Sequence, residues 1–204
     1  MDTTYRGRKS GYMVWKDYKT GKNLLFHKVP YETKKYYLAW TKELQENWIK
    51  IIGIVCDWKR GLLWSFWEIP TQMCHFHQKQ IITRYLTRNP RISANKELRD
   101  IGMSLWRWKR KTRELWLNSW YLRNKERLYE KNEFGWFIHR RTKSAYRSLK
   151  RNIEFLFAYE KHDFLPRTTN KLEWDFSRLK QRLGNHRWLN QKRKEKFIQW
   201  FLNK

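Results

Sequence analysis

The chain has 204 residues, and its 46 Lys and Arg against 19 Asp and Glu give a net charge of +27 at pH 7. A charge of this size attracts polyanions, so nucleic acid is the expected partner and an anionic membrane surface is the second choice. No apolar stretch approaches the roughly 18–20 residues of a membrane span, and the polar N-terminus has no apolar signal-peptide core, which favours a cytoplasmic protein.

The first 88 residues alternate between strand-like and helix-like patterns. Two runs rich in β-branched and aromatic residues, separated by a short polar stretch, predict a β-hairpin. The predicted strands cover 11–19, 23–30, 49–57 and 71–76, and the predicted helices cover 32–47, 59–67 and 77–88. The run at 49–57 is continuously apolar, as in a strand buried on both faces. This alternation predicts an α/β core.

The pattern changes after Asn89 and Pro90. Residues 93–162 contain no proline, and their apolar side chains recur at spacings of three and four, which predicts several helices interrupted at 132–136. Residues 163–170 are predicted as a loop, followed by helices at 171–183 and 191–202.

Three acidic residues stand at predicted structural junctions. Asp57 ends the buried strand, Glu173 lies beside the apolar face of a helix, and Asp2 lies at the N-terminus. Phosphoryl transfer with two divalent ions needs carboxylates that converge from different elements. Each acid also has a structural interpretation: Asp57 as a helix cap, Glu173 as part of a capping box after Asn170, and Asp2 in a frayed terminus.

Four segments together resemble a known family. They are MDTTYRGRKSGYMVWKD, IIGIVCDWKRGLL, QMCHFHQKQIITRYL and TTNKLEWDFSRLKQRLG, starting at residues 1, 51, 72 and 168. In this order they resemble the catalytic domain of bacterial Mutator-type insertion-sequence transposases, which use two aspartates and a glutamate. The resemblance implies an RNase H-like mixed sheet flanked by helices, with an all-helical insertion before the last catalytic helix.

The same resemblance implies the chemistry and its residues. Asp2, Asp57 and Glu173 match the three catalytic acids, which would hold two Mg²⁺ (or Mn²⁺) ions for cleavage of transposon ends and strand transfer into target DNA. The implied partners are DNA and further copies of the chain in a synaptic complex, in a nucleoid-associated bacterial protein. The implied segments are a core at 1–88, an insertion at 89–165 and C-terminal helices at 166–204. The chain starts one residue before the first acid, so most of the first strand is expected to be missing.

Cys74 and His77 match a Cys-x-x-His element of that family. They also form half of a zinc site, which His75, His139 or His162 would have to complete. The two cysteines of the chain form no Cys-x-x-Cys pair. A local structural role is therefore preferred, with Cys74 packed in a strand and His77 bonded at a helix start.

Two basic stretches are the expected DNA contacts. The first interleaves arginine, lysine and tryptophan at 105–116, and the second lies at 190–197. Such residues grip phosphates or stack on bases, although an amphipathic helix with a solvated basic face gives the same pattern. The predicted contacts are Arg107, Lys109, Arg110, Lys111, Arg113, Lys192 and Arg193.

Tryptophan is unusually abundant, with 14 residues against 8 glycines. Trp48 follows Asn47, Trp58 follows Asp57 where the family has Asp-Gly, and Trp188 follows a predicted helix. Glycine is the common residue in such turns because it accepts a positive φ without a steric penalty. The hypothesis is that the source organism reads UGA as glycine and that these positions were translated as tryptophan.

Two other functions remain open. A non-catalytic nucleic-acid-binding protein would use only the basic surface, and its three acids would be structural. A catalytically inactive transposase remnant would keep the resemblance without the chemistry.

Overall fold

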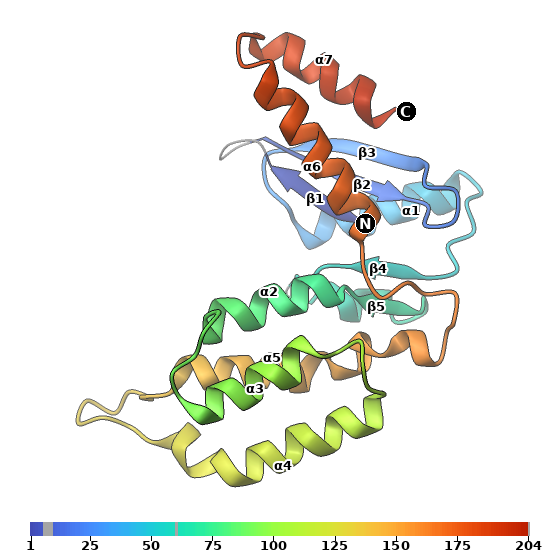
Figure 1. Ribbon diagram of the computed structural model, residues 1–204. Helices are drawn as coiled ribbons and strands as arrows, with labels where there is room; N and C mark the ends of the chain where they lie inside the picture. Colours follow the sequence, from blue (N-terminus) through green and yellow to red (C-terminus); the bar gives the residue numbers. More distant parts are fainter. Residues whose placement is uncertain (6–9, 60, 204) are drawn as a thin grey trace. The chain divides into compact units, whose positions relative to one another are not determined.

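The computed structural model describes residues 1–5, 10–59 and 61–203 of a mixed α/β protein, drawn in Figure 1. The chain divides into two compact units, the first made of Met1–Ile69 with Thr169–Lys204 and the second of Pro70–Thr168. These boundaries differ from those of the predicted segments. Residues 70–88, predicted with the N-terminal core, cluster instead with the helices that follow them.

The first unit contains a three-stranded antiparallel sheet in the order β1-β2-β3. Its strands are β1 (Asp2–Tyr5), β2 (Gly11–Lys16) and β3 (Asn23–Val29). The predicted hairpin is confirmed. Its turn is stabilised by the Asp17 carboxylate, which accepts hydrogen bonds from the Thr20 backbone and hydroxyl, and by Gly21 at a φ of 72°.

Helix α1 (Lys34–Glu46) packs against one face of this sheet and confirms the helix predicted at 32–47. It begins at Thr33, whose side chain accepts a hydrogen bond from the Tyr36 N–H. Trp15 of β2 packs its ring 5.6 Å from that of Tyr37 and donates its indole N–H to the Thr41 hydroxyl. The sheet and α1 are thereby joined by both apolar and polar contacts.

Helices α6 (Asn170–Asn185) and α7 (Gln191–Leu202) contribute the other side of this core. Alternate residues of β2 point away from α1 because strand side chains alternate between faces. They join one apolar cluster with the two helices: Tyr12, Val14, Leu172, Phe176, Leu179, Ile198 and Leu202. The helices predicted at 171–183 and 191–202 are confirmed.

Strand β4 (Ile54–Cys56) is much shorter than the strand predicted at 49–57. Ile52 is 49% exposed, so the apolar run is not buried throughout. The amino group of Met1 donates a 2.8 Å hydrogen bond to the Val55 carbonyl, which places the start of β1 beside β4. Within the helix predicted at 59–67, of which residue 60 lies outside the described residues, the described part forms only η1 (Leu63–Phe66), a single 3₁₀ turn.

The second unit is helical apart from the short strand β5 (Thr71–Met73) and a bridge between Lys131 and Phe137. Its elements are α2 (His75–Leu86), α3 (Ser93–Met103), α4 (Arg110–Tyr129), α5 (Arg140–Leu156) and η2 (Ala158–Glu160). This confirms the helices predicted within 93–162. The predicted break at 132–136 joins α4 to α5, with Gly135 at a φ of 76°.

The core of the second unit contains a fully buried indole and a buried polar network. Trp120 is 0% exposed and donates its indole N–H to the Ala94 carbonyl. Gln78 of α2 hydrogen-bonds to Ser148 and Asn152 of α5. Within the described part of the chain, no helix has the length and apolar character needed to cross a membrane.

Candidate metal centre

Asp2 is the first residue of β1 and lies opposite Val14 of β2. Its carboxylate accepts a 2.7 Å hydrogen bond from the Thr3 N–H, and the residue is only 8% exposed. The interpretation of Asp2 as part of a frayed terminus is therefore wrong. Pairing with β2 and the bond from Met1 to Val55 give this acid a fixed position in the sheet.

Glu173 lies in the first turn of α6, four residues after the N-cap residue Thr169. A capping box would use the third position, which is occupied by Leu172. Leu172 and Phe176 belong to the apolar core between α6 and the sheet. The packing of this helix therefore sets where the half-buried Glu173 side chain lies.

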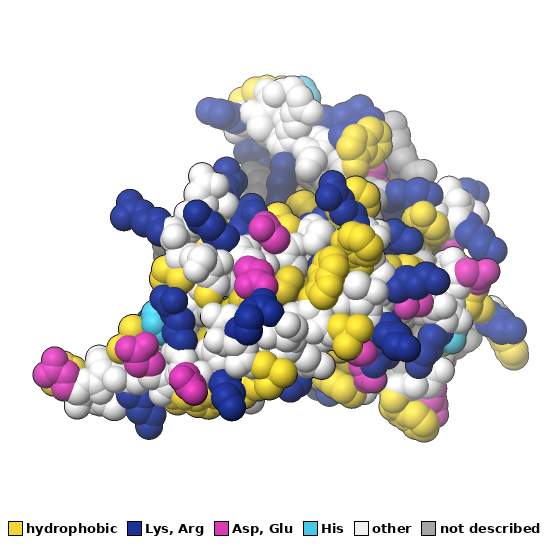
Figure 2. All heavy atoms as spheres, turned by 60° about the horizontal axis from the view of Figure 1, so that its bottom comes forward, with side chains coloured by type: hydrophobic (Ala, Val, Ile, Leu, Met, Phe, Trp, Pro, Cys, Tyr) yellow, Lys and Arg dark blue, Asp and Glu magenta, His cyan; other side chains and the backbone are white. Residues whose placement is uncertain are grey.

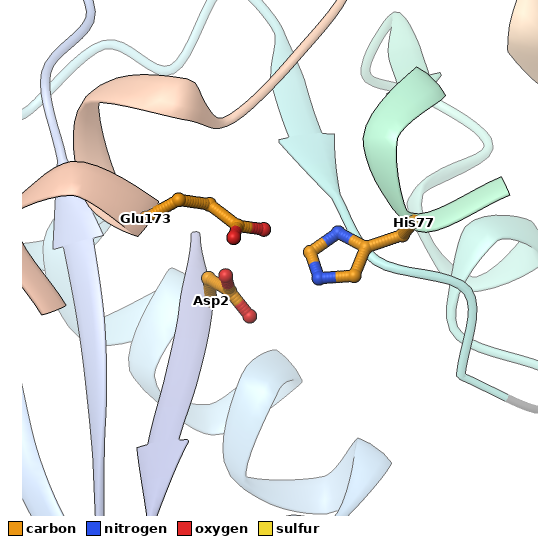
Figure 3. A group of neighbouring side chains, drawn as sticks. All are labelled: Asp2, His77 and Glu173. Atoms are coloured by element: carbon orange, nitrogen blue, oxygen red, sulfur yellow. The ribbon is translucent and has the colours of Figure 1, made fainter. Parts of the chain in front are cut away.

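The structure brings Asp2 and Glu173 together, as Figure 3 shows. A carboxylate oxygen of one lies within 4.8 Å of a carboxylate oxygen of the other. Two carboxylates this close repel each other unless a proton or a cation lies between them. Two oxygen donors at this separation fit the preference of Mg²⁺ for carboxylate ligands. His77, also drawn in Figure 3, belongs to the second unit.

Asp57 follows β4 directly and is half-buried. Its carboxylate accepts a hydrogen bond from the Trp58 N–H. It does not cap a helix, because the next helical turn starts at Leu63 and has no side-chain cap. Among the described residues, no group of three or more ligand atoms lying within 4.8 Å of one another includes Asp57. Of the three predicted acids, Asp2 and Glu173 are therefore close together and Asp57 is not part of their group.

Tyr37 is a neighbour of this site that the sequence did not point to. Its hydroxyl donates a 2.6 Å hydrogen bond to Glu32 and lies 3.0 Å from the Thr3 hydroxyl. Burial raises the pKa of Tyr37 well above its usual value, and the nearby charge of Glu32 raises it further. The phenol thus stays protonated and links α1 to β1 one residue after Asp2.

Cys74 and His77 occupy the start of α2 in the second unit. Cys74 is the fully buried N-cap residue, and His77 lies half-buried in the first turn. Within the described ranges, no group of three or more potential metal ligands contains Cys74. None contains His75, His139 or His162 either, so the residues named to complete a zinc site are not gathered around it.

The predicted DNA contacts of the second unit divide into exposed and internal side chains. Arg107, Lys109 and Lys111 are exposed. Arg110 instead pairs with Glu114 at 2.7 Å and with Glu154 at 3.3 Å. Arg113 is 2% exposed and donates to the Ser104 carbonyl, so it is not a surface contact. In the first unit, Lys192 and Arg193 lie exposed at the start of α7.

Basic and apolar side chains are intermixed on the face drawn in Figure 2. Exposed indoles include Trp48, Trp67, Trp136 and Trp188. No protein-family model, no curated protein and no solved structure matches the chain.

Proposed function

We propose that the chain is the catalytic part of a DNA transposase, in which Asp2, Asp57 and Glu173 hold divalent metal ions for phosphodiester cleavage and strand transfer. The observation that carries this proposal is the approach of the Asp2 and Glu173 carboxylates to within 4.8 Å. The two residues are 171 positions apart in the sequence, since 173 − 2 = 171, and come from a strand and a helix.

The order of elements in the first unit supports an RNase H-like core. Three antiparallel strands are followed by α1 and then by β4, whose Val55 carbonyl bonds to Met1 at the start of β1. Asp2 and Asp57 each follow one of these two bonded residues closely in the sequence. Helix α6 adds Glu173 from across the apolar core. Asp2 thus lies on β1, Asp57 directly after β4 and Glu173 on α6, all within one compact unit.

The residues fit one divalent ion more completely than two. Asp2 and Glu173 offer hard oxygen ligands, and a second ion would need the Asp57 carboxylate as well. When bound, the ions lower the pKa of water and stabilise the charge that develops on the attacking and leaving oxygens. The protein would contribute position: β1 and α6 hold two acids in place, and Tyr37 fixes the segment next to Asp2.

A plasmid-nicking assay tests the proposal. The protein is incubated with supercoiled DNA and Mg²⁺ or Mn²⁺, beside the variants Asp57→Asn and Glu173→Gln. Asp163→Asn, which removes an exposed acid from the second unit, is the matched control. We expect metal-dependent nicking by the parent and by Asp163→Asn, and loss of nicking in the other two with DNA binding retained.

DNA binding without metal-dependent nicking in the parent would favour the second candidate, a non-catalytic nucleic-acid-binding protein or an inactive remnant. The observation that favours this second candidate is that Asp57 does not belong to the close group of carboxylates. Nicking that survives Glu173→Gln would remove Glu173 from the catalytic site.

A further inference from the structure

A face of α5 in the second unit carries three cations in register. Lys143, Arg147 and Lys150 are spaced by four and three residues, so they lie on the same side of the helix. Arg147 and Lys150 are exposed, whereas Lys143 is 5% exposed. The Lys143 ammonium is held 3.3 Å from the ring centre of Phe137 and 4.0 Å from that of Tyr129.

Tyrosines of α4 and α5 border this row of charges. The rings of Tyr121 and Tyr146 stack 4.8 Å apart at an angle of 12°, and the Lys150 ammonium lies 5.7 Å and 5.8 Å from their centres. Tyr129 is 52% exposed. Aromatic rings thus orient Lys143 and Lys150 without neutralising their charge.

The cations of this face form no ion pair among the described residues. Nearby acids are engaged elsewhere: Glu154 pairs with Arg110, and Glu130 lies 3.4 Å from His139. The pKa of Tyr129 is lowered, first by its hydrogen bond with Tyr121 and then by the charges of the three cations. The positive charges of Lys143, Arg147 and Lys150 therefore act together at the position of Tyr129.

We propose that Lys143, Arg147, Lys150 and Tyr129, here called the α5 basic face, bind the phosphate backbone of DNA. That the polyanion is DNA rests on the proposed function. That the ligand is a polyanion rests on the three clustered cations, which form no ion pair among the described residues. The three cations extend over seven residue steps, or roughly 10 Å of helix, a length over which B-DNA carries about six phosphate charges on its two strands. Contacts to phosphates carry no sequence information, so the face is expected to bind DNA without sequence preference.

The test measures DNA binding as a function of salt concentration, with EDTA present so that cleavage plays no part. The double variant Arg147→Gln/Lys150→Gln is compared with Arg88→Gln/Lys96→Gln, which removes the same charge from exposed positions of the same unit. We expect the slope of log K against log salt to fall by roughly 1.8 in the first variant, for two lost phosphate contacts. In Arg88→Gln/Lys96→Gln we expect a much smaller decrease of this slope.

Equal slopes in the two double variants would overturn the α5 basic face, because total charge alone would then explain binding. Tyr129→Phe removes a hydroxyl without changing the charge of the protein. We expect this variant to bind DNA more weakly while the slope stays the same, whereas loss of one cation would change the slope by about one. Failure of the nicking assay leaves this comparison intact, so the two proposals fail separately.

A second, independent observation concerns residue 48. Trp48 has a φ of 62°, the left-handed region that a bulky residue rarely adopts. Trp48 follows Asn47, the C-cap residue of α1, and its N–H donates to the Gln45 carbonyl. The N–H of Ile49 donates to the Leu44 carbonyl. These two bonds form a Schellman motif, whose left-handed position is normally glycine.

Packing of the Trp48 side chain does not offset this strain, because the residue is 96% exposed. Trp15 and Trp120 provide the contrast within the same chain. Both are buried, and both donate an indole hydrogen bond. Trp58 and Trp188 are not among the described non-glycine residues with a positive φ, so the backbone makes no comparable demand at those two positions.

We infer that residue 48 is glycine in the protein that the source cell makes, encoded by UGA. The codons of the gene test this directly: we expect UGA for residue 48 and UGG for residues 15 and 120. Mass spectrometry of peptide 43–50 from source cells gives the second readout, lighter than the printed sequence by the difference between tryptophan and glycine. A UGG codon at residue 48, or a peptide carrying tryptophan, would overturn the inference.

Discussion

The backbone N–H of Ile49 donates a 3.0 Å hydrogen bond to the Leu44 carbonyl, and this bond closes the end of α1 around Trp48. The left-handed conformation that results costs a non-glycine residue roughly 1–2 kcal/mol. The hydrogen bonds at the helix end therefore determine the backbone conformation, and the residue at position 48 has to adopt it.

Trp48→Gly is expected to stabilise the protein by about 1 kcal/mol, because glycine adopts this conformation without the steric penalty. Urea denaturation measures the change. Trp48→Ala is the control, since it removes the exposed indole but keeps a Cβ atom. Equal stability of the two variants would mean that the left-handed backbone carries no measurable strain.

Replacing one acid of the close pair is expected to abolish stabilisation of the protein by metal, because Glu173→Gln removes one oxygen ligand. Thermal unfolding with EDTA and with Mg²⁺ measures the effect. A variant that Mg²⁺ stabilises as much as the parent would show that the ion binds elsewhere.

His75 is expected to make the stability of the protein depend on pH. Burial lowers the pKa of His75 to about 4, and its Nε2–H donates to the Leu156 carbonyl. The unfolded chain, with a histidine pKa of about 6.5, binds more protons between these two values, so stability falls as the pH drops through this window.

The expected loss from His75 between pH 7 and pH 5 is on the order of 2 kcal/mol. Urea denaturation at the two pH values measures it. His75→Asn removes the titrating group, and its stability is expected to change less over the same range. A parent that is equally stable at both pH values would show that His75 titrates alike in the folded and unfolded chains.

Two tryptophans of α4 are expected to respond differently to the same substitution. Trp120 is 0% exposed and bonds to the Ala94 carbonyl, so Trp120→Phe loses a buried hydrogen bond and packing volume, at a cost of about 1–3 kcal/mol. Trp116 is 39% exposed, and Trp116→Phe is expected to cost less than 1 kcal/mol. Similar losses would contradict the burial difference.

Much of the fold was predictable from local pattern. The hairpin at the start of the chain and the helices α1, α6 and α7 follow from periodicity, caps and turn residues that lie within each segment. The strand at 49–57 and the helix at 59–67 were less predictable, because a short apolar run fits a strand, a buried loop or a helical turn equally well.

The sequence by itself determined the positive charge, the elements with strong periodicity and the acids available for metal chemistry. Only the tertiary structure decided which acids meet. Asp2 and Glu173 approach because β1 pairs with β2, and β2 packs against α6 through residues such as Val14 and Phe176. The tertiary structure also buries Arg113, which the sequence suggested as a DNA contact. Both outcomes depend on packing between distant segments, which no local pattern encodes.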